Sequence, residues 1–433
     1  AQEGARQGDA LRASGASAPL LGLPITIKDA IDVEGLPTTS GLVDRRDRVA
    51  PSDAPAVAAL RRGGAIIMGK TNVPPRASDW QTSNELFGRT NNPWDSRRTP
   101  GGSTGGGAAA IAAGLSPLEL GSDIGGSIRV PAAFCGVYGH RPSDGLVPRG
   151  GHVPGPRLPN PGTVLNVLGP LSRSAGDLDL ALRVLAVGDR GEDAAWKLEM
   201  LPPRHTSLRE FRIAIMPELE WLPLARDVRL AMTRVSERLR ALGATVEVSI
   251  PEGFGDCRQY HRVYTSLLAA IFNFNTGLPE ELRYERVREL RDTGDEFDVA
   301  RAEGLLASAQ QFLEWLDQRE EYRERYQEFF RRWDVLLAPI TLTPAFPHDD
   351  SPFAKRVVRV DGQDIPYERM SVYPGLATLT GQPATAFPAG QSADRLPIGL
   401  QAIGPYLEDR TPIAFAALLA EEIGGFVPPP GFD

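Results

Sequence analysis

The sequence predicts one large α/β domain, a β-sheet with helices on its faces, into which a helical segment is inserted. Residues 211–250 alternate strand, amphipathic helix and strand, the pattern that builds such a sheet. Residues 256–332 are almost continuously helical and form the insert. Length alone would suggest about three domains of roughly 150 residues. However, the 433 residues show no obvious linker and no internal repeat, so a single domain over 1–433 is favoured.

In the first half of the chain, apolar periodicity and breaker residues set the expected elements. The helix over 53–62, for example, follows Ser52 and is stopped by Gly63 and Gly64. The expected elements are a helix over 1–15, a β-run over 20–28, the helix over 53–62, a strand over 65–68, a helix over 105–113, a strand over 117–121 and a short helix over 128–134. Residues 71–102 are polar and read as loop. Residues 140–171 are rich in Pro and Gly and predict an ordered excursion over the surface.

In the second half of the chain, predicted strands and helices alternate more clearly. The expected elements are strands over 211–216 and 244–250 around a helix over 225–242, the helical insert over 256–332, strands over 335–339, 384–388 and 399–403, and a closing helix over 411–423. Within the insert, the charge-rich stretch 314–332 reads as a solvated helix face.

Composition excludes several classes of protein. The chain carries 47 Lys and Arg against 55 Asp and Glu, a net charge of -8, and so lacks the basic footprint of a nucleic-acid-binding protein. Cys135 and Cys257 match no zinc or disulfide spacing, which fits a reducing compartment. No apolar run is long enough to cross a membrane and no signal pattern is found, so a cytoplasmic location is expected.

Two glycine-rich segments hold the densest concentration of candidate chemistry. They run over 98–107 and 121–129, and their serines, Ser103 and Ser127, lie 24 residues apart. A serine between glycines and a following helix can present its hydroxyl beside unobstructed backbone N–H groups. Such groups stabilise the oxyanion of a tetrahedral acyl intermediate. The pair of segments therefore points to acyl transfer at a serine.

Other interpretations of the glycines are weaker. Residues 101–105 match the G-x-S-x-G nucleophile elbow, which needs a strand running straight into the serine, but residues 91–100 read as loop. A phosphate loop would need that strand and a lysine as well. An esterase that pairs Ser103 with a histidine base remains an alternative, because the local sequence neither excludes nor favours any of the five histidines as that base. They are His140, His152, His205, His261 and His348.

Lys28 is the other candidate base. The chain has four lysines, and this one ends an apolar strand and is followed by Asp29. A salt-bridged or snorkelling lysine is one interpretation. A buried one is the other, because burial lowers the pKa from its usual value of about 10.4 and allows a neutral amine.

These residues resemble the amidase signature family, and its stand-alone bacterial amidases in particular. The matching segments cover nearly the whole chain: residues 22–29, 69–74, 100–106, 121–132, 134–139 and 397–401. The resemblance implies a large mixed twisted β-sheet covered by helices on both faces. The segment over 140–148 and the Pro-rich stretch to Pro161 favour the free-standing members.

The resemblance also implies a Ser–Ser–Lys triad without metal or organic cofactor. Ser127 would be the nucleophile, Ser103, preceded by a cis peptide bond, would relay the proton, and Lys28 would be the base. The implied oxyanion hole is formed by backbone N–H groups of Ile124, Gly125, Gly126 and Ser127. Asp123, Arg129 and Thr104 would support the site.

Substrate and partners are expected from the same likeness. Ala77, Ser78 and Trp80 would line the acyl pocket, and the insert would cover it with Tyr260, Tyr264 and Phe272, although such aromatics more often belong to a core. The expected activity is hydrolysis of a small carboxamide or aryl amide, with a small-molecule amide as partner, no nucleic acid, no membrane, and a homodimer left open. The alternatives are a glutaminase-like subunit of a tRNA-dependent amidotransferase and a non-catalytic binding protein.

The sequence also departs from the family pattern. Thr104 and Gly107 stand where members more often carry Ser. Only 27 residues precede Lys28, so helices that usually come before it are expected to be missing.

Overall fold

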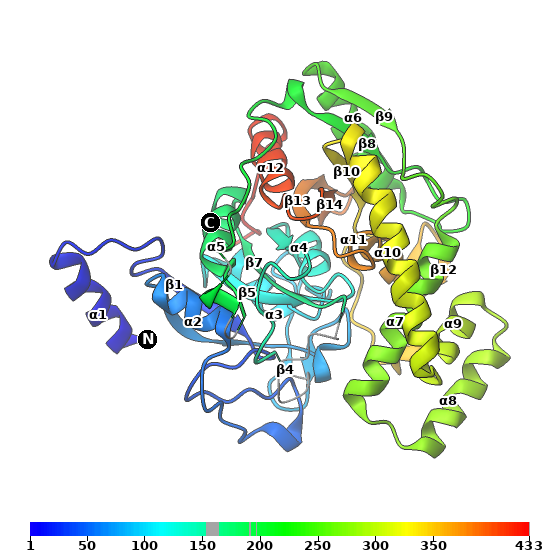
Figure 1. The fold of residues 1–433 in the computed structure, drawn as a ribbon, viewed down its shortest axis with the longest axis horizontal. Helices are drawn as coiled ribbons and strands as arrows, with labels where there is room; N and C mark the ends of the chain where they lie inside the picture. Colours follow the sequence, from blue (N-terminus) through cyan, green and yellow to red (C-terminus); the bar gives the residue numbers. More distant parts are fainter. Residues whose placement is uncertain (153–163, 190–191, 196, 433) are drawn as a thin grey trace.

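A ten-stranded mixed sheet organises the molecule (Figure 1). The computed structural model describes residues 1–152, 164–189, 192–195 and 197–432. In spatial order the strands are β2 (Ile66–Thr71), β1 (Pro24–Lys28), β5 (Leu118–Asp123), β7 (Val167–Ser172), β6 (Tyr138–Arg141), β13 (Ala384–Gln391), β14 (Pro397–Ile403), β10 (Val335–Pro339), β8 (Arg212–Ile215) and β9 (Thr245–Val248). The sheet is parallel at both ends, where β2, β1 and β5 pair and where β10, β8 and β9 pair. Its centre is antiparallel.

Helices pack around this sheet and confirm the predicted fold class. They are α1 (Gln2–Ala13), α2 (Pro55–Arg62), α3 (Gly105–Ala112), α4 (Arg129–Cys135), α5 (Ala175–Leu185), α6 (Arg226–Ala241), α11 (Val372–Thr378) and α12 (Arg410–Ile423). The short helices α3 and α4 contact each other and lie on β5 and β14 respectively. Apart from Arg129, both are made of small or apolar residues that are almost all buried, so they pack closely against the strands. This packing places the two glycine-rich segments side by side.

The predicted helical insert consists of four helices: α7 (Arg258–Thr276), α8 (Glu280–Asp292), α9 (Glu296–Leu305) and α10 (Ala309–Arg332). They gather at the opposite end of the molecule from α1 (Figure 1). The side chain of Asp295 caps α9, and Ser308 and Gln311 form a capping box at the start of α10. Helix α7 packs against α9 and α10 within the insert and against α11 outside it.

Residues 140–171 differ from their prediction. They were expected to cross the surface, yet they contribute part of β6 and most of β7 to the middle of the sheet. Pro and Gly are normally excluded from central strands, but Gly169 faces the His140 carbonyl at a distance that leaves no room for a side chain. Close approach of two backbones thus explains the glycine. Residues 153–163 of this stretch, with the Pro-rich run to Pro161, lie outside the described residues.

Elements that lack a clear sequence signal complete the fold. Two small hairpins are formed by β3 (Ser83–Asn84) with β4 (Gly88–Arg89), and by β11 (Val357–Val360) with β12 (Gln363–Pro366).

Cys135 and Cys257 are both buried free thiols. Within the described part of the chain, no helix has the length and apolar character needed to cross a membrane.

Candidate active site

Lys28 lies at the end of β1, where its amine meets the first glycine-rich segment. The Lys28 Nζ atom is 2.7 Å from Ser103 Oγ and 3.0 Å from Thr104 Oγ1. A third hydroxyl, Ser122 Oγ, lies 3.0 Å away. The structure therefore brings together Lys28, Ser103 and Thr104, which the sequence analysis singled out, and adds Ser122.

Burial changes the chemistry of this amine. Lys28 is wholly buried, and the loss of water lowers its pKa to about 7, although the negative charges of Asp123 and Glu119 oppose the shift. At neutral pH a large share of the molecules thus holds a neutral amine. A neutral amine 2.7 Å from a serine hydroxyl can accept its proton.

The two candidate serines sit on neighbouring backbone segments. Ser103 follows a cis Gly102–Ser103 peptide bond and leads into α3. The N–H of Thr104 donates a 3.1 Å hydrogen bond to the carbonyl of Ser127, which joins the two segments. Ser127 lies on the loop between β5 and α4 and lines a cavity. Across the described residues, no hydrogen bond engages its hydroxyl, which leaves this group available to a substrate.

A buried ion pair shapes the loop that carries Ser127. Arg129 Nε and Nη2 each lie 3.0 Å from the Asp123 carboxylate, and both side chains are wholly buried. The same carboxylate accepts the N–H groups of Gly126 at 2.9 Å and Ile128 at 3.2 Å. Burial alone would raise the pKa of Asp123, but the Arg129 guanidinium holds it well below its usual range. Asp123 therefore remains a carboxylate around which the loop is folded.

This loop narrows the set of N–H groups available to an oxyanion. Gly126 N–H is already committed to Asp123, whereas the N–H groups of Ile124, Gly125 and Ser127 form no hydrogen bond to any described residue. Gly126 has a φ of +93°, and an added Cβ would lie 2.8 Å from Pro374 Cγ. The turn consequently requires glycine for both its backbone conformation and its packing.

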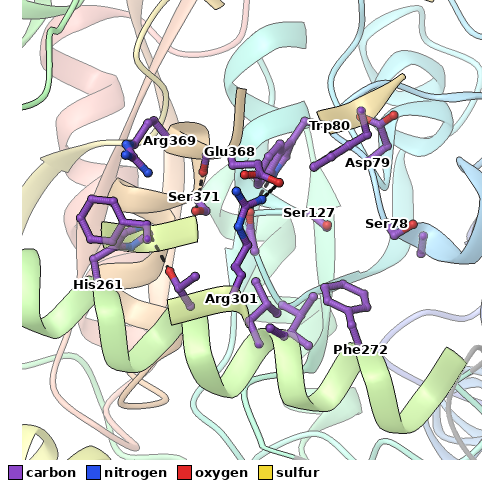
Figure 2. A pocket seen from close by; sticks show the side chains of 18 residues that line it. Ser78, Asp79, Trp80, Ser127, His261, Phe272, Arg301, Glu368, Arg369 and Ser371 are labelled. Carbon is purple, nitrogen blue, oxygen red and sulfur yellow. Dashed lines mark hydrogen bonds and ion pairs between the residues drawn. The ribbon is translucent and has the colours of Figure 1, made fainter. Parts of the chain in front are cut away.

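A cavity of about 150 Å³ opens in front of Ser127 (Figure 2). Ala77, Ser78 and Trp80, the expected pocket residues, line one side of it. The opposite side is a face of α7, so the insert reaches the pocket. The apolar lining from the insert and its neighbours comprises Leu268, Ala269, Phe272, Phe297 and Phe353.

The three aromatic residues expected to cover the pocket divide into two groups. Phe272 lines the cavity. Tyr260 and Tyr264 are buried, and their hydroxyls donate to the carbonyls of Leu376 at 2.7 Å and Ile124 at 3.0 Å. Tyr264 thus braces the serine loop from the insert, a role that helical spacing alone does not reveal.

Charged residues at one side of the cavity were missed by sequence reasoning. Arg301 of α9 points toward Glu368 and pairs with it, as Figure 2 shows. Arg369 pairs with Asp295. These residues come from distant segments without a shared motif, so only the fold brings them together. His261, on the same wall, is buried, and the loss of water lowers its pKa to about 3, which keeps the imidazole neutral.

The histidines find other partners than the two serines. His140 lies beside Thr385 and Asp409, His152 beside Asn166, His205 beside Asp334, His261 beside Thr265 and His348 beside Asn91. Across the described ranges, none of the five forms a hydrogen bond with Ser103 or Ser127. The esterase alternative that pairs Ser103 with a histidine therefore has no geometric support.

Comparison with known proteins gives a consistent family assignment. The family profile described as Amidase matches residues 1–412. A glutamyl-tRNA(Gln) amidotransferase subunit of Roseiflexus castenholzii is 35% identical over 94% of this chain and 83% of its own length. The crystal structure of the corresponding glutamyl-tRNA(Gln) amidotransferase subunit from Thermotoga maritima has a TM-score of 0.74 at 27% identity, covering 94% of this chain and 86% of that one. A chain from a vestigial protein complex related to the origins of an s-triazine catabolic enzyme reaches a TM-score of 0.79 at 29% identity, covering 99% and 90%.

These relatives correct the expected partners. The chain was expected to act without partners other than a small-molecule amide or a second copy of itself, and without any link to nucleic acid. That expectation is wrong. The relatives are named as subunits of a glutamyl-tRNA(Gln) amidotransferase, and one structural neighbour comes from a protein complex. The error has a physical cause. The motifs surround the reacting groups, which free and assembled enzymes share, whereas partner surfaces lie outside them.

Proposed function

The chain belongs to the amidase family, and we propose that it is the amide-hydrolysing subunit of an amidotransferase, acting through Ser127, Ser103 and Lys28. The contact that carries this proposal is the 2.7 Å hydrogen bond between Lys28 Nζ and Ser103 Oγ in a buried environment. It supplies a base beside a serine, next to a second serine that faces a cavity. This is the arrangement that nucleophilic catalysis at a serine requires.

The chemistry follows from these positions. The Ser127 hydroxyl attacks the amide carbonyl while Ser103 takes its proton and passes its own to the neutral amine of Lys28. The protonated network then gives a proton to the leaving nitrogen, and the C–N bond breaks. Water attacks the resulting acyl-enzyme by the same route in reverse and releases the acid. The N–H groups of Ile124, Gly125 and Ser127, which no described residue engages, would stabilise the negative charge of both tetrahedral intermediates.

The amidotransferase role is supported by the relatives and by the charged side of the cavity. The relatives share more than a third of their residues with this chain over most of their length. Arg301, Arg369 and Glu368 line the cavity and supply charges of both signs, which suit the carboxylate and ammonium of an amino-acid amide such as glutamine. The apolar wall beside Leu268 and Phe272 suits the methylene groups between those charges and the amide.

Two measurements test the proposal. A fluorophosphonate probe should label Ser127, identified by peptide mapping, and Lys28→Ala should lower the labelling rate about 10²- to 10⁴-fold, the usual contribution of a general base. Labelling at Ser103 instead would overturn the assignment of the nucleophile.

The second measurement addresses the assembly. Tagged chain purified from its own cells should co-elute with other subunits and release ammonia from glutamine. The same chain stripped of its partners by high salt should release much less, and Ser127→Ala should abolish the activity in both preparations. An isolated chain that forms no assembly, and that hydrolyses simple amides faster than glutamine, would contradict the subunit role.

A further inference from the structure

A second buried acidic group lies behind the candidate base and has no part in the chemistry described above. Glu119 is wholly buried on β5. In the parallel pairing of β1 with β5, Thr26 is the partner of Glu119, and Lys28 follows two residues later on β1. Since alternate residues of a strand point to the same face, Glu119 and Lys28 lie on one face of the sheet, beneath α3.

The surroundings of this carboxyl favour its protonated form. Its Oε1 atom lies 2.5 Å from the hydroxyl of Thr71, while its Oε2 atom has no hydrogen-bond partner in the described part of the chain. A buried carboxylate with a bare oxygen is costly. Burial accordingly raises the pKa of Glu119 to about 7, against the opposing effects of the Thr26 and Thr71 hydroxyls and of Lys28 and Lys70.

Space for the carboxyl is provided by a glycine of the helix above it. A Cβ atom at Gly107 would lie 2.5 Å from both Cγ and Cδ of Glu119. The α3 helix therefore carries its glycine where the acidic side chain passes under it. This close fit holds the carboxyl on the side of the sheet where Lys28 lies.

The charged groups around the pair are few. Besides burial, which lowers the pKa of Lys28, the negative charges of Asp123 and Glu119 act to raise it. Burial and the positive charge of Lys28 both lower the pKa of His152. Glu119 is influenced by Lys28 and by Lys70, whose own ion-pair partner is Asp29 at 3.3 Å. Asp123 is held as a carboxylate by Arg129. Lys28 and Glu119 both have a pKa of about 7, so the protonation of both groups changes near neutral pH.

We propose that Glu119 is a positioning residue that governs how much of Lys28 is in its reactive, neutral form. The proposal rests on the role of Lys28 as the base. When the two side chains together carry one titratable proton, they have two arrangements, neutral amine with carboxylic acid, or ammonium with carboxylate. The first can accept a proton from Ser103 and the second cannot. The second arrangement thus silences the site, although the total charge of the pair is the same in both.

Glu119→Gln tests this proposal because the amide mimics the protonated carboxyl and cannot ionise. The variant loses the silent ion pair, so the neutral form of Lys28 should prevail at lower pH. We expect the midpoint of the profile of fluorophosphonate labelling rate against pH to move down by up to about one pH unit. Rates well above the midpoint should stay close to those of the unaltered chain, whereas rates below it should rise by up to about ten-fold, because more of the amine is neutral there. A structural role alone would change stability but not this midpoint.

Companion variants make each outcome decisive. Thr71→Val removes the hydroxyl that stabilises the ionised carboxylate, so its midpoint should move in the same direction by a smaller amount. This variant decides the question if Glu119→Gln does not fold. Glu247→Gln removes an exposed carboxylate on the edge strand β9 and should leave the profile unchanged.

Lys28→Ala separates the two proposals. If this variant is not labelled while folded Glu119→Gln gives the unaltered profile, the role of Glu119 is overturned and the triad stands. If Lys28→Ala is labelled normally, the triad fails and the role of Glu119 fails with it.

Discussion

The indole Nε1 of Trp80 donates a 2.8 Å hydrogen bond to the carbonyl oxygen of Gly125. This contact joins a wall of the substrate cavity directly to the loop whose N–H groups are proposed to face the reacting carbonyl. The ring of Trp80 also packs against Phe353 and Tyr367, with centroid separations of 6.1 Å and 5.3 Å. A substrate that touches this wall therefore touches the support of the proposed oxyanion site as well.

Trp80→Phe should lower catalysis more than it lowers stability. The substitution keeps an aromatic ring on the wall and removes the donor to Gly125. Loss of one hydrogen bond between neutral groups corresponds to about 1 kcal/mol, or roughly a five-fold lower rate of fluorophosphonate labelling. Rates measured on variants of equal melting temperature would show it. An unchanged rate would mean that the loop holds its shape without the indole.

The rate of Ser127 labelling should rise with pH through the region near 7 and then level off. Burial lowers the Lys28 pKa to about 7, so the amine is protonated and inactive below this value and neutral above it. His261, whose pKa is about 3, stays neutral throughout this range. Rates measured from about pH 5 to about pH 9 would reveal the rise. A flat profile would exclude Lys28 as the base.

Thr104 should tolerate loss of its methyl group but not of its hydroxyl. Its Oγ1 lies 3.0 Å from Lys28 Nζ and helps to hold the amine toward Ser103. Thr104→Ser should keep the labelling rate, because the hydroxyl remains. Thr104→Val has nearly the same shape and should label several-fold more slowly, as expected for loss of about 1 kcal/mol of hydrogen bonding. Equal rates for the two variants would show that Ser103 and Ser122 suffice to orient the amine.

Breaking the buried ion pair of Asp123 should be strongly destabilising. Arg129→Met leaves a buried carboxylate without its bidentate partner, and such a loss costs about 3–5 kcal/mol. The matched control is Arg97→Met. It breaks a pair of similar geometry in which Arg97 is 86% exposed, where no measurable change is expected. Urea unfolding compares the two variants. Similar small changes in both would show that Arg141, whose Nη1 donates to the Asp123 carbonyl at 3.0 Å, can take over.

The sequence predicted the parts of the site that depend on local chemistry. Ser103, Ser127 and Lys28 were singled out because glycines around a serine and a lysine at a strand end are unusual, and the structure places all three in one region. The pocket residues Ala77, Ser78 and Trp80 followed from the resemblance and do line the cavity. The large mixed sheet was predicted for the same reason.

What the sequence could not predict depends on contacts between distant segments. Gly126 was expected to face the oxyanion, but Asp123 three residues earlier already accepts its N–H. Arg301 and Glu368 meet only because the fold brings α9 of the insert against the short 3-10 helix Tyr367–Ser371 that follows β12. Strands β6 and β7 were hidden by the Pro and Gly around them, although Gly169 is there because the His140 backbone approaches it closely. The expectation about partners was wrong because the sequence motifs surround the reacting groups, and partner surfaces lie outside those motifs.

Gly107 and Glu119 offer a test of close packing that does not depend on activity. Gly107→Ala would normally stabilise a helix by about 1 kcal/mol. Here the added Cβ would meet the Glu119 side chain at 2.5 Å, and such overpacking costs about 1–3 kcal/mol, so the substitution should destabilise the chain. In a Glu119→Ala background the space is free, and the same substitution should become stabilising. Urea unfolding of the two single variants and the double variant gives their coupling, expected at about 2 kcal/mol. If Gly107→Ala has the same effect in both backgrounds, the helix shifts freely over the strand, and the carboxyl is not held in place by the helix above it.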